Sequence, residues 1–245
     1  YYNYFMTISL AAEKIPGLPI TNSLLTGMAA TLIILAIFAL LIRGIRRTPG
    51  SKQNFAEWIV EGFLNLVESI TGDHQKALKL LPLGITFFIF ILVNNWLGLL
   101  PGVGSIGFKE IEDGKEVFVP LLRSSNADLN TTLALALVSV VSIQRFGIGE
   151  LGIKYFKKFI NFSGPIQFGI GLLEILSEFA KIISFSFRLF GNVFAGEVLL
   201  AVITGLLPLI APLPFYGLEL FVGLIQALVF TILSLVFFHV AMQQH

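Results

Sequence analysis

The feature that most constrains this chain is a run of 29 residues, 182–210, with only two ionisable side chains, Arg188 and Glu197. A helix needs about 20 mostly apolar residues to cross the hydrocarbon core of a bilayer. An arginine keeps its proton there, and a charge near the bilayer centre costs at least about 3 kcal/mol. Such side chains normally belong to functional sites. The run therefore predicts a membrane-embedded helix whose fixed positive charge has a function.

The composition extends this conclusion to the whole chain. Hydrophobic residues make up 56% of the 245 residues and charged residues only 13%, whereas soluble domains carry about a quarter charged residues. The net charge of +1 gives no electrostatic basis for binding nucleic acid. The chain has no cysteine and only three scattered histidines. We therefore expect no disulfide, no metal site and no cofactor.

We predict an all-α polytopic membrane protein with about five membrane-embedded helices in a single membrane domain, residues 1–245. The expected membrane segments are 24–42, 80–100, 126–146, 166–207 and 215–243, with the last two forming a long tilted hairpin. In 51–72, apolar residues at helical spacing lie opposite Glu57 and Glu61, which is typical of an amphipathic helix on the membrane surface. Residues 103–125 are expected to form a polar loop.

Basic residues in the loops indicate the orientation. Ten lie on one side, namely Arg43, Arg46, Arg47, Lys52, Lys76, Lys79, Arg145, Lys154, Lys157 and Lys158, and four on the other, namely Lys14, Lys109, Lys115 and Arg123. The side with more lysine and arginine is normally the inner one. We therefore expect the N-terminus outside and the C-terminus inside.

The segment 166–207 is too long for an upright helix. Its 42 residues would reach about 63 Å at 1.5 Å per residue, roughly twice the thickness of a bilayer core. It must tilt steeply, run along the membrane, or break. Gly191 and Gly196 mark possible bends, or places where a neighbouring helix comes close.

Seven polar residues of this segment share about one third of the helix circumference. They are Glu174, Ser177, Glu178, Lys181, Ser184, Arg188 and Asn192. A stripe that only packed against other helices would use small polar residues and would avoid an arginine with no acid one turn away. A packing stripe remains the alternative. We expect the Arg188 guanidinium to be neutralised by another helix or by another chain.

A second group of polar residues involves the last helix. Folding the hairpin near residue 207 places Glu197 opposite Glu219, and Arg188 near Gln226, although a slip of about two turns is an alternative. Carboxylates in apolar surroundings can exchange protons near neutral pH, whereas snorkelling to the interface is the alternative for each. The pattern predicts a proton path lined by Glu197, Glu219, Asn192 and Gln226, with Arg188 as a barrier to leakage.

These residues carry a family resemblance. Residues 184–197, SFSFRLFGNVFAGE, resemble the signature of subunit a of the F-type ATP synthase, the stator part of its membrane rotor motor. Further similar motifs are Asn95-x-x-Gly98-Leu-x-Pro101, Asn126-x-Asp128-x-Asn130-Thr and Leu224-Ile-Gln226-Ala. The resemblance covers roughly residue 18 to the C-terminus.

The resemblance implies roles for the polar residues. Arg188 would face the ion-carrying carboxylate of each passing c-ring subunit, flanked by Asn192 and Gln226. Glu197 and Glu219 would form the outer half-channel, with Asp128 and Asn130 at its mouth. The inner half-channel would be lined by Glu174, Ser177, Glu178, Lys181 and Ser184. Some family members have a histidine at the position of Glu219, so the tuning of the outer acids differs here.

The resemblance also implies a proton-translocating subunit without an active site or cofactor. Its partners would be the c-ring, the peripheral-stalk b subunits, the rest of the F1Fo complex and the lipid bilayer. Its location would be an energy-transducing membrane, most simply the bacterial plasma membrane. The 51–72 helix would anchor on the membrane or dock on the stalk. A proton-coupled secondary transporter or channel is the alternative, but the two halves lack the inverted repeats of many transporters.

Overall fold

The computed structural model describes residues 12–16, 19–43, 50–100, 103–104, 106–112, 115–159, 164–207 and 210–243. Its elements are α1 (Asn22–Arg43), α2 (Ser51–Thr71), α3 (His74–Gly98), β1 (Gly107–Glu112), β2 (Lys115–Pro120), the short 3-10 helix η1 (Ser125–Ala127), α4 (Leu129–Leu151), the 3-10 helix η2 (Gly152–Lys158), α5 (Pro165–Leu206) and α6 (Pro212–Ala241). Arg46, Arg47, Pro101 and Pro208 lie outside the described residues.

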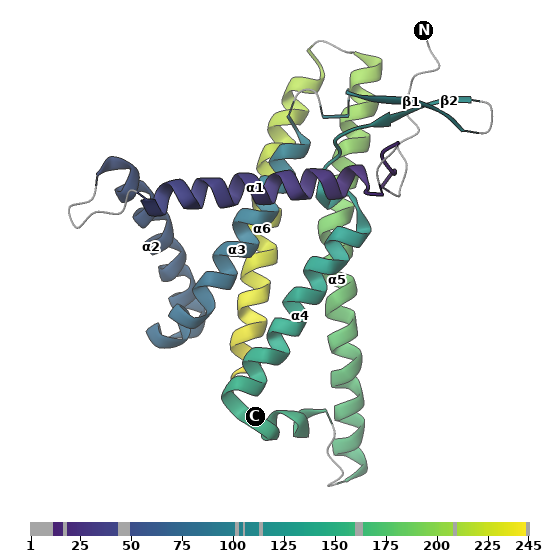
Figure 1. Cartoon of the computed structure of the whole chain (residues 1–245). Helices are drawn as coiled ribbons and strands as arrows, with labels where there is room; N and C mark the ends of the chain where they lie inside the picture. The colour runs from purple at the N-terminus through teal and green to yellow at the C-terminus, as the bar shows by residue number, and fades with distance from the viewer. Residues whose placement is uncertain are drawn as a thin grey trace.

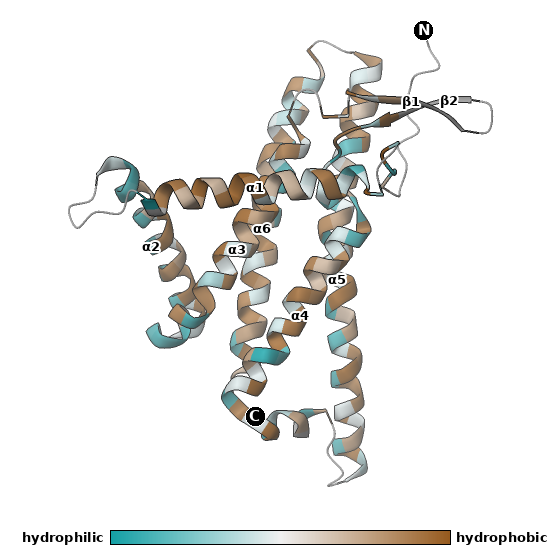
Figure 2. Ribbon diagram, viewed as in Figure 1, coloured by the Kyte–Doolittle hydropathy of each residue, from teal (hydrophilic) through white to brown (hydrophobic). Residues whose placement is uncertain are grey.

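Five of the described helices are long and apolar enough to cross a membrane. They begin at Asn22, His74, Leu129, Pro165 and Pro212. Figure 2 shows hydrophobic residues along most of their length and hydrophilic residues mainly near the loops and on α2. The prediction of an all-α polytopic membrane protein is confirmed, with one small β hairpin as an addition.

Two of the observed boundaries differ from the predicted segments for a local reason. α3 begins at His74, because the Asp73 carboxylate accepts hydrogen bonds from the backbone N–H groups of Gln75 at 2.8 Å and Lys76 at 3.3 Å. Hydropathy alone placed the start at residue 80, since the first turn is polar. α4 likewise continues to Leu151, five residues beyond the predicted end at residue 146.

The segment predicted as a polar loop contains the hairpin of β1 and β2. The strands pair antiparallel, with Gly107 opposite Pro120 and Glu112 opposite Lys115. The many charged residues of this segment obscured its strand character in the sequence. Figure 1 shows the hairpin projecting from the end of the molecule where α5 ends and α6 begins.

The long helices α5 and α6 run antiparallel, with α3 packed against α6 and α4 packed against both α5 and α6. In Figure 1, α5 and α6 run between the top and the bottom of the view, and α1 runs from side to side. The 22 residues of α1 correspond to about 33 Å, close to the thickness of a bilayer core. α1 and the α5–α6 hairpin therefore cannot both stand upright in one membrane.

The core lies between α3, α4, α5 and α6 and combines aromatic rings with paired hydroxyls. The ring of Phe230 lies 5.5 Å from that of Phe87 and 4.9 Å from that of Phe185, centroid to centroid. The Ser139 and Ser234 hydroxyls are 2.9 Å apart and join α4 to α6. Small hydroxyl residues commonly hold membrane helices together, because lipid provides no hydrophobic force between them.

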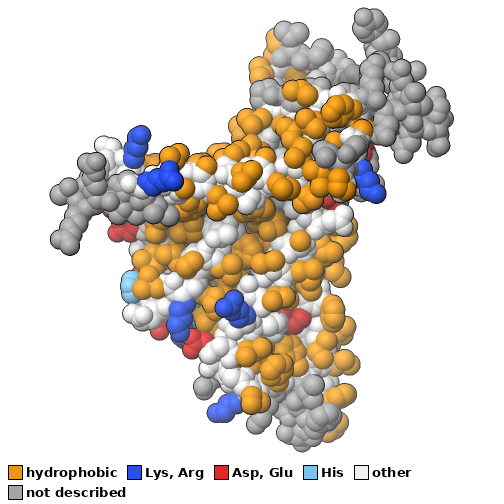
Figure 3. Space-filling model, viewed as in Figure 1, with side chains coloured by type: hydrophobic (Ala, Val, Ile, Leu, Met, Phe, Trp, Pro, Cys, Tyr) orange, Lys and Arg blue, Asp and Glu red, His pale blue; other side chains and the backbone are white. Residues whose placement is uncertain are grey.

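Large apolar side chains also cover the outer surface. Figure 3 shows them over α1 and the helices beside it, with lysine and arginine mainly at the margins of this face. In a membrane protein such a surface is expected to face lipid or other subunits.

Candidate functional site

Three of the residues predicted for the outer proton path, Asn192, Glu197 and Glu219, meet at one small cavity of about 20 Å³. Its lining consists of Asn95, Gly98, Leu99, Ser124, Asn192, Val193, Glu197, Glu219 and Gly223. This volume is enough for about one water molecule. A larger open hollow of about 500 Å³ lies at the other end of the molecule, beside Lys76, Glu150 and Met242, and it contains none of the predicted site residues.

Glycines bring the acidic side chains together. A methyl group at Gly196 would collide with the Glu219 carboxyl, so this glycine lets Glu219 lie directly against the backbone of α5. At Gly223, a Cβ would lie 3.2 Å from the Cβ of Asn95, so α6 also approaches α3 closely. The hairpin thereby places Glu219 beside Glu197, in the register predicted without a slip.

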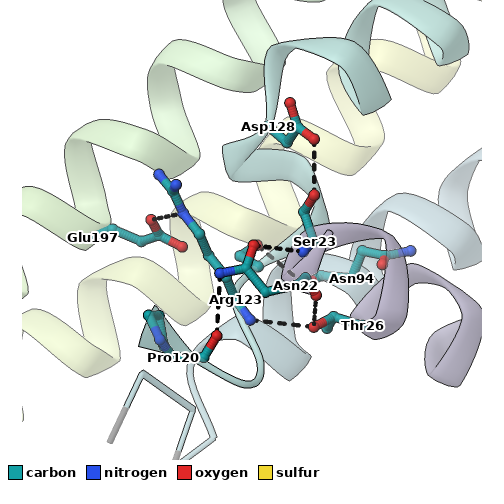
Figure 4. Close-up of polar contacts among 9 residues, drawn as sticks. Asn22, Ser23, Thr26, Asn94, Pro120, Arg123, Asp128 and Glu197 are labelled. Atoms are coloured by element: carbon teal, nitrogen blue, oxygen red, sulfur yellow. Dashed lines mark hydrogen bonds and ion pairs between the residues drawn. The ribbon is translucent and has the colours of Figure 1, made fainter. Parts of the chain in front are cut away.

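The sequence analysis missed the charged partner of Glu197. The Arg123 Nε donates to the Glu197 Oε2 at 3.3 Å, and Arg123 is buried, with only 7% of its surface exposed. Figure 4 shows its guanidinium directed at Glu197 from the loop between β2 and η1. In the sequence analysis, Arg123 served only as one of the basic loop residues on the outer side. Nothing in the spacing indicated that it folds back onto α5.

The loop that carries Arg123 is held on both sides. The backbone N–H of Arg123 donates to the Thr26 hydroxyl on α1 at 3.2 Å. The next residue, Ser124, packs so closely on Gly98 of α3 that a Cβ at Gly98 would lie 2.8 Å from the Ser124 hydroxyl oxygen. The buried Asn126 amide donates to the Asn95 side-chain oxygen at 2.7 Å. The backbone at Arg123 is therefore fixed, and its buried guanidinium is held by the bond to Glu197.

Asp128 and Asn130 lie next to this loop but do not line the cavity. The Asp128 carboxylate caps α4 by accepting from the backbone N–H of Asn130 at 3.0 Å, and it accepts from the Ser23 hydroxyl of α1 at 2.8 Å. The Asn130 amide also donates to Asp128, at 3.1 Å. An acid directly before an apolar run is a helix N-cap signal, so this structural contact could have been read from the sequence.

Arg188 lies apart from the acids of this chain. Its guanidinium donates to the Ser184 hydroxyl at 3.1 Å, and within the described residues no carboxylate forms an ion pair with it. Both side chains are exposed, beside the exposed Ile183 and Phe187. Of the two expected ways to neutralise Arg188, a partner helix within the chain is therefore not found in the described part.

Two buried amide groups, one on α5 and one on α6, stay unsatisfied. The Asn192 Nδ2 and Gln226 Nε2 atoms are buried without a hydrogen-bond partner among the described residues. Gln226 lies one turn beyond Gly223 on α6, and Asn192 lies one turn beyond Arg188 on α5. Buried amides normally find partners, so these groups are available to water or to a group from another chain.

The two predicted inner acids, Glu174 and Glu178, form ion pairs with lysines. The Lys181 Nζ lies 2.8 Å from the Glu178 Oε1 and 4.9 Å from the centre of the Phe237 ring. The Lys158 Nζ lies 2.6 Å from the Glu174 Oε1. Lys158 belongs to η2, and the sequence analysis used it only to set the orientation. The predicted stripe thus divides, because Ser177, Ser184 and Arg188 are exposed while Glu178 is buried.

Comparisons with known proteins show the family of this chain. The model of the family described as "ATP synthase A chain" matches residues 24–239. A protein named "ATP synthase subunit a" from Geotalea daltonii is 34% identical over 218 residues, which cover 88% of this chain and 84% of the relative. The chain therefore belongs to the ATP synthase A chain family.

Proposed function

We propose that this chain is the ion-translocating stator subunit of the membrane part of an ATP synthase. Two offset aqueous half-channels would load and unload protons on c-ring carboxylates, coupling proton flow to rotation and ATP synthesis. The observation that carries the proposal is the Arg188 guanidinium, exposed on an apolar helix face without an acid partner in the described chain. A charge of this kind in a membrane needs a partner, and a rotor carboxylate supplies one.

The proposed step at Arg188 follows from electrostatics. A protonated rotor carboxyl is neutral and can face lipid. When it reaches the guanidinium, the adjacent positive charge favours the ionised form, and the proton leaves. Arg188 also repels protons that would otherwise pass straight from one half-channel to the other. Net flow then requires that the rotor turn.

The outer half-channel would follow the cavity beside Glu197 and Glu219. From there, the unsatisfied amides of Asn192 and Gln226 provide polar groups toward Arg188. Asp128 and Asn130 support the mouth by fixing the start of α4 against α1. The contacts support a path with room for single water molecules, and not for a continuous pore.

The inner half-channel would use the other end of α5. Glu174, Ser177, Glu178, Lys181 and Ser184 provide polar groups along this end of the helix. The ion pairs of Glu174 and Glu178 with lysines keep charged groups on the apolar helix α5. A proton released beside Arg188 would leave along the exposed side, where Ser184 lies one turn away.

The orientation and partners follow from the same reasoning. With α1 upright, the α5–α6 hairpin lies steeply tilted in the membrane and can present a long face to the c-ring. The N-terminus would be outside and the C-terminus inside, in an energy-transducing membrane such as the bacterial plasma membrane. The b subunits would contact the remaining apolar surface, and α2 would lie on the inner membrane surface. The subunit would have no active site of its own.

Cysteine cross-linking tests the rotor-facing surface. The chain has no cysteine, so single cysteines can be introduced without a background. Phe187→Cys replaces a side chain that is 56% exposed one residue from Arg188, and Trp58→Cys on α2 is a control at 69% exposure. We expect Phe187→Cys to cross-link to a cysteine placed beside the rotor carboxylate, and Trp58→Cys not to do so. Absence of the first cross-link in an assembled complex would refute the rotor contact.

A further inference from the structure

The outer cavity is surrounded by an unequal number of opposite charges. Two carboxylates, Glu197 and Glu219, line it, and one guanidinium, that of Arg123, pairs with Glu197 at 3.3 Å. Within the described part of the chain, Glu219 has no cationic or hydrogen-bonded partner. With both acids ionised, this site would carry a net charge of one negative unit in largely apolar surroundings. One bound proton makes it neutral.

The position of Arg123 decides which acid takes that proton. Its backbone is fixed to Thr26 and its neighbour Ser124 is packed on Gly98. From this anchored loop the buried guanidinium contacts Glu197 at 3.3 Å. Glu219 instead lies against the backbone at Gly196. Apolar surroundings favour the protonated form of both carboxyls, whereas the adjacent guanidinium favours the ionised form of Glu197 alone. The two acids therefore differ in their surroundings although they share one cavity.

Stability alone is a weak explanation for this buried ion pair. Removing two charges from water costs about as much as their attraction returns, and apolar replacements are often neutral or stabilising. A protein can retain such a pair when the charge has a further use. Glu197 of this pair lines the cavity beside Glu219, and Arg123 contacts Glu197 at 3.3 Å.

We propose that Arg123 is a positioning residue that keeps Glu197 ionised and thereby makes Glu219 the carboxyl that carries the exchangeable proton of the outer half-channel. The inference rests on the proposed function, and it assigns different roles to two acids that the sequence treated as equivalent. Arg123 acts through Glu197 and does not itself carry the proton.

The exchange step is a simple proton transfer. A hydronium ion in water at the cavity gives its proton to a carboxylate oxygen of Glu219, forming an O–H bond and leaving water. In the opposite direction, the Glu219 O–H bond breaks and water at the outer side takes the proton. Glu197 and Arg123 stay charged throughout the exchange. They therefore provide a constant dipole beside Glu219 and beside the water that exchanges protons with it.

The charges near Glu197 come from two elements. The described contacts place Arg123 against it from the loop before η1, and Glu219 lines the same cavity from α6. α3 contributes the neutral Asn95, and the loop also contributes the neutral Ser124. On α5 itself, Asn192 is the polar neighbour at the cavity, and it does not titrate. Changes at Arg123 or Glu197 therefore act mainly on the Glu219 carboxyl.

The test is the pH dependence of ATP-driven proton pumping in inverted vesicles, where the lumen corresponds to the outer side. The whole complex is used, and initial rates are recorded after equilibration of the lumen at a series of pH values. The near-isosteric neutral variants are Arg123→Gln, Glu197→Gln and the double variant Arg123→Gln/Glu197→Gln. Arg123→Lys retains the charge and is the conservative control.

The variants should shift the profile in opposite directions. In Arg123→Gln, Glu197 no longer has its cation and also retains protons, so release into the lumen should require a pH higher by about 1 unit. In Glu197→Gln, the Arg123 cation is no longer balanced by the Glu197 carboxylate and disfavours protonation of Glu219, so the profile should move to lower pH. The double variant and Arg123→Lys should keep the pH midpoint of wild type even where their maximal rates are lower, because both leave the charge beside Glu219 balanced.

A merely structural role predicts a different result. Each variant would then lower the amount of assembled complex or the maximal rate without moving the profile, and this result would overturn the inference. A double variant shifted as far as Arg123→Gln would also overturn it. If Arg123→Gln fails to assemble, two results still test the inference. The pH profile of Glu197→Gln should move to lower pH, and the profile of Arg123→Lys should keep the wild-type midpoint; the absence of the first shift would overturn the inference.

A parallel measurement of Arg188→Ala separates the two proposals. Lost pumping in Arg188→Ala together with unshifted Arg123→Gln and Glu197→Gln profiles would refute only the role of Arg123. Normal pumping in Arg188→Ala would refute the proposed function and, with it, the assignment of Glu219 as proton carrier. Lost pumping with opposite shifts supports both.

Discussion

Replacing Gly196 by alanine tests whether the position of the Glu219 carboxyl matters for proton transfer. The new Cβ would lie 2.6 Å from the Glu219 Oε1 and closer still to two other atoms of the same carboxyl. Ordinary van der Waals contact begins near 3.4 Å, and the nearest carboxyl atom sets the required movement, which is about 1 Å. It can do so only by leaving the backbone of α5 or by entering the small cavity.

The expected effect on activity is large and the expected effect on folding is small. A displacement of about 1 Å at a reacting group can lower a rate by about 100-fold, and the cavity of about 20 Å³ has little room for the displaced oxygen atoms. Alanine favours a helix over glycine by about 1 kcal/mol, so the backbone of α5 should not be weakened. We therefore expect Gly196→Ala to assemble and to pump protons about 10 to 100 times more slowly than wild type.

The assay is ATP-driven acidification of inverted vesicles, with the amount of assembled complex measured in the same membranes. Gly217→Ala is the matched control, because it makes the same change on α6 and its Cβ would meet nothing within 4 Å. Gly196→Ala pumping at the rate of Gly217→Ala, with equal assembly, would refute the reasoning about Glu219.

Three further predictions concern structural contacts of the described residues. Asn95→Ala removes the amide that donates to the Gly223 carbonyl at 3.0 Å and accepts from Asn126. This variant should destabilise the fold by about 1–2 kcal/mol. An unchanged thermal midpoint of the purified complex would contradict this expectation. Lys181→Ala leaves the buried Glu178 without its cation and should destabilise the fold by about 3 kcal/mol. Lys79→Ala breaks the more exposed pair with Glu150 and should change the stability by less than about 1 kcal/mol. Equal effects of the two variants in a denaturation series would contradict the argument from burial. Backbone N–H bonds from Gln75 and Lys76 hold the pKa of Asp73 below its usual range. Its carboxylate therefore stabilises the start of α3 above the unfolded pKa and loses this effect as the pH falls through the lower folded pKa. Wild type should unfold at higher temperature than Asp73→Ala at neutral pH and should approach it below about pH 4, and a constant difference down to strongly acid pH would contradict the capping role.

The convergence of Glu197 and Glu219 could be predicted from the sequence. Two long apolar helices joined by a proline-containing turn must lie antiparallel, and residues at equal distances from the turn then lie opposite each other. Gly196 was noted as a point of close approach, and it is the place where the Glu219 carboxyl meets α5. Helical periodicity also indicated the polar stripe that contains Arg188.

The contributions of loops could not be predicted. Arg123 lies 74 residues from Glu197 in the chain, and Lys158 reaches Glu174 from a 3-10 helix. Periodicity gives the face of a helix but not the path of a loop, so both residues were used only as markers of membrane orientation. The balance of charge at the outer cavity, and with it the difference between the two acids, appears only when these loops are folded against the helices.

The most direct test of the central claim is ATP-driven proton pumping by Arg188→Ala, measured beside wild type with the passive proton leak recorded in the same vesicles. As an exposed barrier that meets rotor carboxylates, Arg188 is required for coupling, so the variant should assemble, lose pumping and leak protons faster than wild type. Normal pumping with a wild-type leak would contradict the barrier role and would leave the polar stripe of α5 as a packing surface.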